Sequence, residues 1–221
     1  MSFRRIHLRK LLVAFGSPEA KQVSMLRSDI RSEIAKENGQ SNGGGDFHVP
    51  FWSDAKSYVL NGTDLASRTE TRVASNKQRK RLYPSLHDGF MDWWNNKKRF
   101  NNEEIVPYPT EIKARFTVDG LDATVKVENF LGLSVGGDEK RLIYPYFAEK
   151  PTLSEQNARL GLWLISKAFP KHQIDDFRIL DVLRGKSYSP KDCKWKGNEE
   201  ATFGLLYGRL LSRWDELRAE Y

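Results

Sequence analysis

The sequence predicts an α/β protein in which a mixed central sheet is flanked by helices. Apolar and polar residues alternate along residues 111–135, and residues 141–148 form an apolar run of strand length. Apolar residues recur at three- and four-residue spacing along residues 17–37, 82–99 and 199–217, which indicates amphipathic helices. Because such strands and helices follow one another along the chain, we expect the helices to pack on the faces of the sheet.

The first helix has clear ends, but its surroundings are less regular. Ser17 suits the N-cap, Pro18 suits the first turn, and Asn38 precedes a glycine that can end the helix. We expect the residues before it to form a strand or a short helix, because charges interrupt the apolar run that a signal peptide would need. Residues 39–46 are predicted to be a glycine-rich linker, and residues 47–81 show no clean period.

The second half of the chain alternates strands and helices. Asp119 and the glycine after it mark the turn of a β-hairpin within the alternating stretch. Thr152 and Glu155 fit a capping box for an apolar helix over residues 153–169. Residues 177–183 read as one more strand, and the chain ends with the long C-terminal helix.

The net charge of +7 is unevenly distributed along the chain. Residues 1–100 contain 18 Lys/Arg against 10 Asp/Glu, a balance of +8, whereas residues 101–221 contain 18 against 19, a balance of −1. We therefore expect a helical and basic N-terminal segment, residues 1–81, and a core over residues 82–221. A basic half suits a polyanionic partner, with nucleic acid the first candidate, although a solvated basic surface fits the same composition.

Two runs of basic residues are the candidate nucleic-acid contacts. They comprise Arg68, Arg72, Lys77, Arg79, Lys80, Arg81, Lys97, Lys98 and Arg99. Such runs are usually solvated faces, and a phosphate-contacting arm is the alternative interpretation. Trp93 and Trp94 could stack on bases, but their helical spacing favours a place in the core.

Composition and motifs disfavour several other classes. Cys193 is the only cysteine, which excludes an intramolecular disulfide and a cysteine zinc cluster and suits a reducing cytoplasm. No apolar run approaches the roughly 18 residues of a membrane span, so no membrane partner is expected. The P-loop, GxGxxG and HExxH motifs are absent. The histidines are scattered, as is typical of structural or exposed positions: His7, His48, His87 and His172.

Between residues 86 and 190 the elements follow a recognisable order. A helix with His87 comes first, then a hairpin that begins near Glu111, a third strand, an apolar helix, and a strand that turns through Gly185. This order resembles the core of the PD-(D/E)XK nuclease superfamily, in its RecB-like branch. The resemblance covers nearly half of the chain and implies a restriction-endonuclease-like fold.

The chain differs from that superfamily at the positions of the catalytic residues. There, two or three carboxylates hold Mg²⁺ beside the scissile phosphate, and a lysine helps to position the attacking water. Pro145 stands in the position of the third-strand acid and Phe147 in that of the lysine, and neither can replace an oxygen ligand. We therefore expect no catalytic residue, no metal and no cofactor, with Phe147 packed against Trp163.

An active enzyme with relocated ligands is the alternative. Its catalytic residues would be Glu111, Glu128, Glu149 and Lys150, and Glu111 and Glu128 would hold Mg²⁺. The aspartate position of the second strand falls at Glu128 or Asn129. Glu149 and Lys150 are adjacent, so on a regular strand their side chains point to opposite faces.

The favoured hypothesis is a non-cleaving nuclease-fold protein that binds nucleic acid, DNA before RNA. By analogy with the superfamily alone, it would be an accessory subunit in a phage-defence or mobile-element system. A third hypothesis is a protein-interaction module, with a protein partner or a second copy of the chain bound through the tryptophans.

Overall fold

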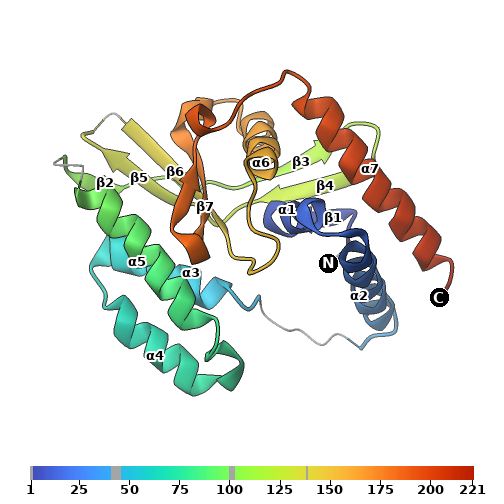
Figure 1. Cartoon of the computed structure of the whole chain (residues 1–221), viewed down its shortest axis with the longest axis horizontal. Helices are drawn as coiled ribbons and strands as arrows, with labels where there is room; N and C mark the ends of the chain where they lie inside the picture. Colours follow the sequence, from blue (N-terminus) through green and yellow to red (C-terminus); the bar gives the residue numbers. More distant parts are fainter. Residues whose placement is uncertain (1, 41–45, 100–102, 138) are drawn as a thin grey trace.

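The structure is a computed structural model that describes residues 2–40, 46–99, 103–137 and 139–221; for residues 97–99 it describes only the backbone. Within these ranges the chain forms seven α-helices and two mixed sheets, of three and five strands. The predicted mixed α/β class is confirmed, and Figure 1 shows the helices packed around the strands.

The larger sheet carries the most regular part of the fold. Its five strands are, in spatial order, β2 (Ile105–Pro107), β5 (Leu131–Val135), β6 (Glu139–Tyr146), β7 (Phe177–Asp181) and β8 (Lys186–Tyr188). β6 and β7 are parallel, and the other neighbours are antiparallel. Because two parallel strands need a crossover, helix α6 (Glu155–Ala168) connects β6 to β7.

The smaller sheet corrects the expectation of one central sheet. It contains β1 (Arg5–His7), β4 (Ala123–Val127) and β3 (Ala114–Val118) in that order. The predicted hairpin forms between β3 and β4, but its second strand stops three residues before β5 begins. The break lies at Asn129, whose φ of 72° is in the left-handed region and turns the chain out of the first sheet.

The remaining helices occupy both predicted and unpredicted segments. They are α1 (Leu8–Gly16), α2 (Glu19–Glu37), α3 (Val49–Asn61), α4 (Leu65–Ser75), α5 (Tyr83–Arg99) and α7 (Glu199–Arg218). The two helices α3 and α4 lie in residues 47–81, where the apolar residues show no clean helical or strand period. Of the predicted linker 39–46, residues 41–45 lie outside the described residues.

Two predicted helix caps are wrong by one or two residues. α2 has Pro18 at its N-cap, because the Ser17 hydroxyl instead donates to the carbonyl oxygen of Val13 at 2.8 Å. Ser154 caps α6 by accepting a hydrogen bond from the Asn157 amide. The Glu155 carboxylate accepts from the Lys194 amide at 3.0 Å, so the predicted capping box with Thr152 does not form.

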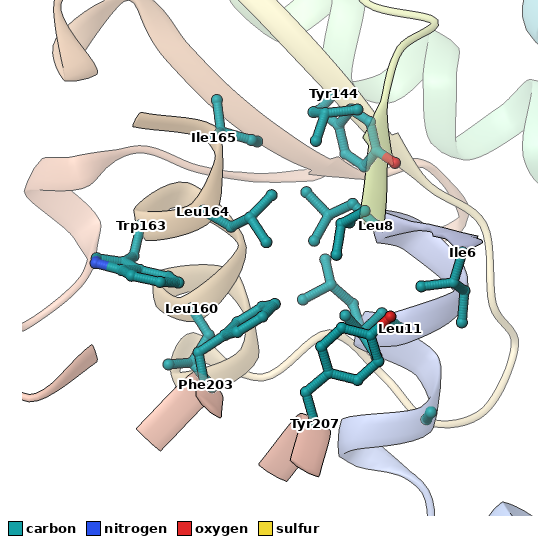
Figure 2. Packing of buried hydrophobic residues seen from close by; sticks show 14 of the residues in the cluster. Ile6, Leu8, Leu11, Tyr144, Leu160, Trp163, Leu164, Ile165, Phe203 and Tyr207 are labelled. Carbon is teal, nitrogen blue, oxygen red and sulfur yellow. The ribbon is translucent and has the colours of Figure 1, made fainter. Parts of the chain in front are cut away.

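The five-stranded sheet separates two hydrophobic clusters. The first contains Tyr144 and Tyr146 and is built with α1, α6 and α7, whose side chains converge in Figure 2. The second contains Ile143 and Phe147 and is built with α3, α4 and α5. The alternation of side chains along β6 therefore decides which cluster each residue joins. Each cluster combines residues from both sides of position 81.

The paired tryptophans belong to the second cluster. Trp93 and Trp94 are 5% and 8% exposed, so the interpretation of them as core residues is confirmed. Across the described parts of the chain, no helix has the length and apolar character to span a membrane.

Candidate nucleic-acid interface

A cleft of about 950 Å³ opens at the C-terminal end of β6. Its walls include Lys21 of α2, the loop residues Phe47 and His48, Arg81 just before α5, and the residues that follow β6. Ligand sites of α/β proteins commonly lie beyond the carboxyl ends of parallel strands, and β6 and β7 form the parallel pair. The position of the cleft within the sheet therefore makes it the first candidate site.

The charge of the cleft is positive. Lys21, Arg81 and Lys150 are exposed cations on its walls. Among the described residues that line it, Glu149 is the only acid, and Arg81 donates a hydrogen bond to each of its carboxylate oxygens. That hydrogen-bonded pairing lowers the pKa of Glu149 and raises the pKa of Arg81. Two lysines consequently remain to meet an anion.

A stacked imidazole forms the inner wall of the cleft. The ring of His48 lies 4.9 Å from that of Phe147, with an angle of 5° between their planes. Asp46 holds the loop by accepting a hydrogen bond from the His48 amide at 3.0 Å and by pairing with Arg9. Burial opposes the charge of Asp46, but the contacts with His48 and Arg9 together hold its pKa well below the usual range.

The end of β6 is apolar where the resemblance would place an acid and a lysine. Pro145 is buried and lies opposite Leu180 of β7. The pairing of β6 with β5 ends at Ile143, so β5 has no residue opposite Pro145 that would accept a hydrogen bond from a backbone N–H, and the proline is tolerated there. Phe147 is 3% exposed.

The expected contact between Phe147 and Trp163 is wrong. Phe147 packs against His48 and against Trp52 of α3, at a ring distance of 5.8 Å from the latter. Trp163 belongs to the cluster on the other face of the sheet. The strand alternation that sends Tyr146 toward α6 sends Phe147 away from it.

The candidate catalytic carboxylates have different neighbours: Glu111 and Glu149 are each paired with a cation, whereas Glu128 lies beside a histidine whose pKa is lowered, mainly by burial. Glu111 accepts a hydrogen bond from Lys113 Nζ at 2.6 Å, and Glu128 lies 3.5 Å from His7 Nδ1. The hydrogen bond from Lys113 to Glu111 raises the pKa of Lys113 most, and Glu128 adds to that rise, so these two acids lie near one lysine. Glu149 is held by Arg81 in the cleft instead.

The proposed ligand set is therefore divided between two places. Glu149 and Lys150 line the cleft, whereas Glu111 lines a separate pocket beside Lys56 and Asn129. In the described portion of the chain, no group of three or more His, Cys, Asp or Glu side chains is arranged to hold a metal ion.

The first basic run separates into structural and free members. Arg68 and Arg72 donate to the buried carboxylate of Asp54, which joins α4 to α3. Arg79 donates to the carbonyl oxygen of Arg72 and lies 5.3 Å from the ring of Tyr83.

The two lysines of this run have no such role. Lys77 and Lys80 are exposed, and neither makes a side-chain hydrogen bond or ion pair to a described residue. The side chains of Lys97, Lys98 and Arg99, which end α5, lie outside the described residues.

Two residues that line the cleft could not be identified from the sequence. Lys21 is one of several polar residues on α2, and His48 stands in a stretch without a period. Their role depends on a loop that brings His48 against a strand about one hundred residues later, as the His48–Phe147 stacking shows. No short-range pattern could reveal that contact.

Searches against protein-family models, curated proteins and solved structures found no match to this chain. The function of the cleft is therefore inferred from its own geometry.

Proposed function

We propose that the protein binds nucleic acid, DNA in preference to RNA, in the cleft at the end of β6, and that it does not cleave the bound strand. The observation that carries this proposal is the pair of exposed lysines Lys21 and Lys150 on a cleft in which the one acid among its described lining residues, Glu149, is already paired with Arg81. Lys77 and Lys80 lie just before Arg81 in the chain and extend the positive surface beyond the cleft. Phosphate groups are the natural partners of such a surface.

The arrangement of elements supports a restriction-endonuclease-like core. The hairpin β3–β4 is followed by β5 and β6, then by α6 and the parallel strand β7. This is the order that the resemblance implies, with the difference that the second strand is broken into β4 and β5 at Asn129. The cleft lies at the end of the third strand of that order.

The residues present do not fit the Mg²⁺ site of that superfamily. Pro145 and Phe147 supply no oxygen ligand and are buried in the core. Glu111 is hydrogen-bonded to Lys113, so Glu128 is left as a single carboxylate beside His7, whereas a hard cation requires several free oxygen ligands in near-octahedral array. The role that we propose is therefore binding without hydrolysis.

Fluorescence anisotropy with labelled duplex DNA, single-stranded DNA and RNA of equal length tests the binding role. Each phosphate contact to B-DNA contributes about 0.9 to the slope of log K against log salt, so the variant Lys21→Ala/Lys150→Ala should lose about two units of slope together with affinity. Arg81 stays unchanged in this variant because its removal would also free Glu149.

Lys171→Ala is the matched control. Lys171 is also exposed, but it precedes β7 and therefore lies toward the opposite end of the parallel pair. If the slope of log K against log salt is unchanged in the double variant, or falls equally in the Lys171→Ala control, the cleft is not the site of DNA binding. Tighter binding of RNA than of DNA would correct the preferred partner.

A further inference from the structure

A second cavity, of about 300 Å³, lies on the face of the five-stranded sheet that α5 covers. Its walls come from α5 and from all five strands, and they share no residue with the cleft. Glu139 and Arg141 reach it from the N-terminal half of β6, whereas the cleft lies beyond the C-terminal end of that strand. The cavity is therefore a separate site at the other end of the sheet.

Three charged side chains meet on this otherwise apolar face. Glu139, Arg141 and Ile143 alternate along β6 and so lie on one side, and Arg178 stands beside Ile143 in the parallel register with β7. Arg141 holds the Glu139 carboxylate with two hydrogen bonds, of 2.9 and 3.0 Å. Among the described residues that line the cavity, two guanidinium groups thus share one carboxylate, which leaves one positive charge in excess in this part of the wall.

Arg178 has no carboxylate of its own among the described residues. Its Nη1 donates to the carbonyl oxygens of Asp175 and Phe177, and no described acid forms an ion pair with it. Burial and then the charge of Arg141 lower the pKa of Arg178, and the charges of Glu139, Asp175 and Asp192 offset this only in part. An additional anion would relieve this repulsion.

One of the residues that line the cavity has a buried donor without a partner among the described residues. Trp93 lines it and is 5% exposed, and its Nε1 has no hydrogen-bond partner among the described residues. Buried indole N–H groups usually find an acceptor. Trp94 and Ser187 complete this end of the wall.

We propose that this cavity binds a small organic anion, in which a carboxylate or phosphate group is attached to a planar or apolar body. Arg141 and Arg178 would contact the anionic oxygens, because guanidinium groups match the geometry of carboxylates and phosphates. The indole N–H of Trp93 would donate to the same group, and the apolar walls would cover the body of the ligand. A volume of about 300 Å³ is at the small end of ligand pockets, so a compact molecule is expected.

Binding of four probes to the full chain tests this proposal: inorganic phosphate, phenyl phosphate, benzoate, and the neutral benzamide. Intrinsic fluorescence reports binding directly because Trp93 and Trp94 line the cavity. We expect saturable binding of phenyl phosphate and benzoate, weaker binding of inorganic phosphate, and none of benzamide. A preference between phenyl phosphate and benzoate identifies which anionic group the site takes.

Substitutions give the direction of each charge effect. Arg141→Gln should weaken benzoate binding at least about tenfold, because it also leaves Glu139 unpaired beside the anion. Glu139→Gln should strengthen binding by roughly threefold to tenfold, a gain that a purely structural role for Glu139 would not produce. Trp93→Phe keeps the packing and removes the donor, so it should weaken binding severalfold.

Arg213→Gln is the matched control, since Arg213 forms a similar exposed pair with Glu216 on α7 and does not line the cavity. The proposal is overturned if neither benzoate nor phenyl phosphate binds more tightly than about 10 mM. It is also overturned if benzamide binds as well as benzoate, or if Glu139→Gln and Arg141→Gln bind benzoate with the same affinity as the Arg213→Gln control. None of these results bears on DNA binding in the cleft, because the two sites share no residue.

Discussion

Phe147 occupies the position in which a catalytic lysine would stand if the resemblance extended to the chemistry. Its ring lies between His48 and Trp52 and belongs to the cluster under α3 and α5. An ammonium group in that place would lose its hydration without gaining a described carboxylate in contact with the ring. The residue therefore stabilises the fold at the position that the resemblance would assign to the lysine.

We expect Phe147→Lys to lower the free energy of unfolding by roughly 3 kcal/mol or more, because it both opens a cavity and buries a charge. Phe147→Leu should lower it by only about 1 kcal/mol, since it keeps an apolar side chain of similar shape. Urea denaturation of the two variants measures the difference. Equal stability of the two would show that position 147 faces water and would reopen the question of a polar site.

Cys193 provides a test of burial that depends on pH. The thiol is 4% exposed, and burial raises its pKa to about 11. Only the thiolate reacts with iodoacetamide, so at pH 8 the native protein should be alkylated at least about 100-fold more slowly than the urea-unfolded chain. The rate for the native protein should keep rising with pH up to the raised pKa. Equal rates in the two states would contradict the packing around α6.

Among the secondary-structure elements, the basic run of residues 68–81 contains arginines that stabilise the packing of helices and lysines that are exposed on the surface. Asp54 is 3% exposed and accepts hydrogen bonds from Arg68 and Arg72, so these two arginines fasten α4 to α3. Lys77 and Lys80 have no comparable contact with the described residues.

Two sets of substitutions should separate these roles. Arg72→Gln removes the better-aligned donor of a buried carboxylate and should lower the free energy of unfolding by about 1–3 kcal/mol, with little change in DNA affinity. Lys77→Gln/Lys80→Gln should change stability by less than about 0.5 kcal/mol. The same double variant should reduce the salt dependence of DNA binding by about two units of slope. Thermal or urea unfolding measures the stability, and anisotropy measures the salt dependence of DNA binding. A stable Arg72→Gln variant with weakened DNA binding, or an unstable lysine variant with unchanged DNA binding, would contradict these roles.

The junction between the two sheets depends on one residue. Asn129 tolerates the left-handed region better than most residues, and its carbonyl oxygen accepts a hydrogen bond from Trp52 Nε1 at 2.6 Å. We expect Asn129→Gly to change stability by less than about 0.5 kcal/mol and Asn129→Val to lower it by about 1–2 kcal/mol, because a β-branched residue resists positive φ. If the valine variant were as stable as the glycine variant, a continuous strand through residues 123–135 would be the better description.

The elements that could be predicted are those with a clear period or cap of their own. The helix over residues 17–37 and the crossover from β6 through α6 to β7 follow from local pattern. The helices α3 and α4 were not predictable in this way, because the contact that joins them is a tertiary one between Asp54 and two arginines. The division into two sheets depends on the positive φ of Asn129. The alternation of apolar and polar residues does not reveal this backbone conformation.

The candidate site was predictable only in part for the same reason. The apolar character of Pro145 and Phe147 is visible in the sequence, and both residues are buried in the structure. The stacking of His48 on Phe147 and the position of Lys21 and Lys150 on the walls of one cleft bring together segments that are far apart in the chain. Sequence reasoning therefore identified the strand but not the walls of the cleft.

At the scale of the whole molecule, the two ends of the chain close one side of the fold. The Tyr207 hydroxyl donates to the carbonyl oxygen of Phe3 at 2.6 Å, and Asp29 accepts from the Phe3 amide and from Trp214 Nε1. These contacts fix α1 and α2 against α7 (Figure 1). Lys21 of α2 is thereby held on one wall of the cleft, while Arg81 is held on the other by the cluster beneath α5.

The central claim is that this cleft binds DNA without cutting it, and one measurement addresses both parts. A labelled duplex is titrated with the protein at several salt concentrations in the presence of Mg²⁺ or Mn²⁺, and the same samples are run on a denaturing gel after the anisotropy is read. We predict an affinity that falls steeply and linearly with log salt, and a labelled strand that stays at full length. Metal-dependent fragments that disappear with Glu128→Ala would contradict the account and establish the relocated nuclease site in its place.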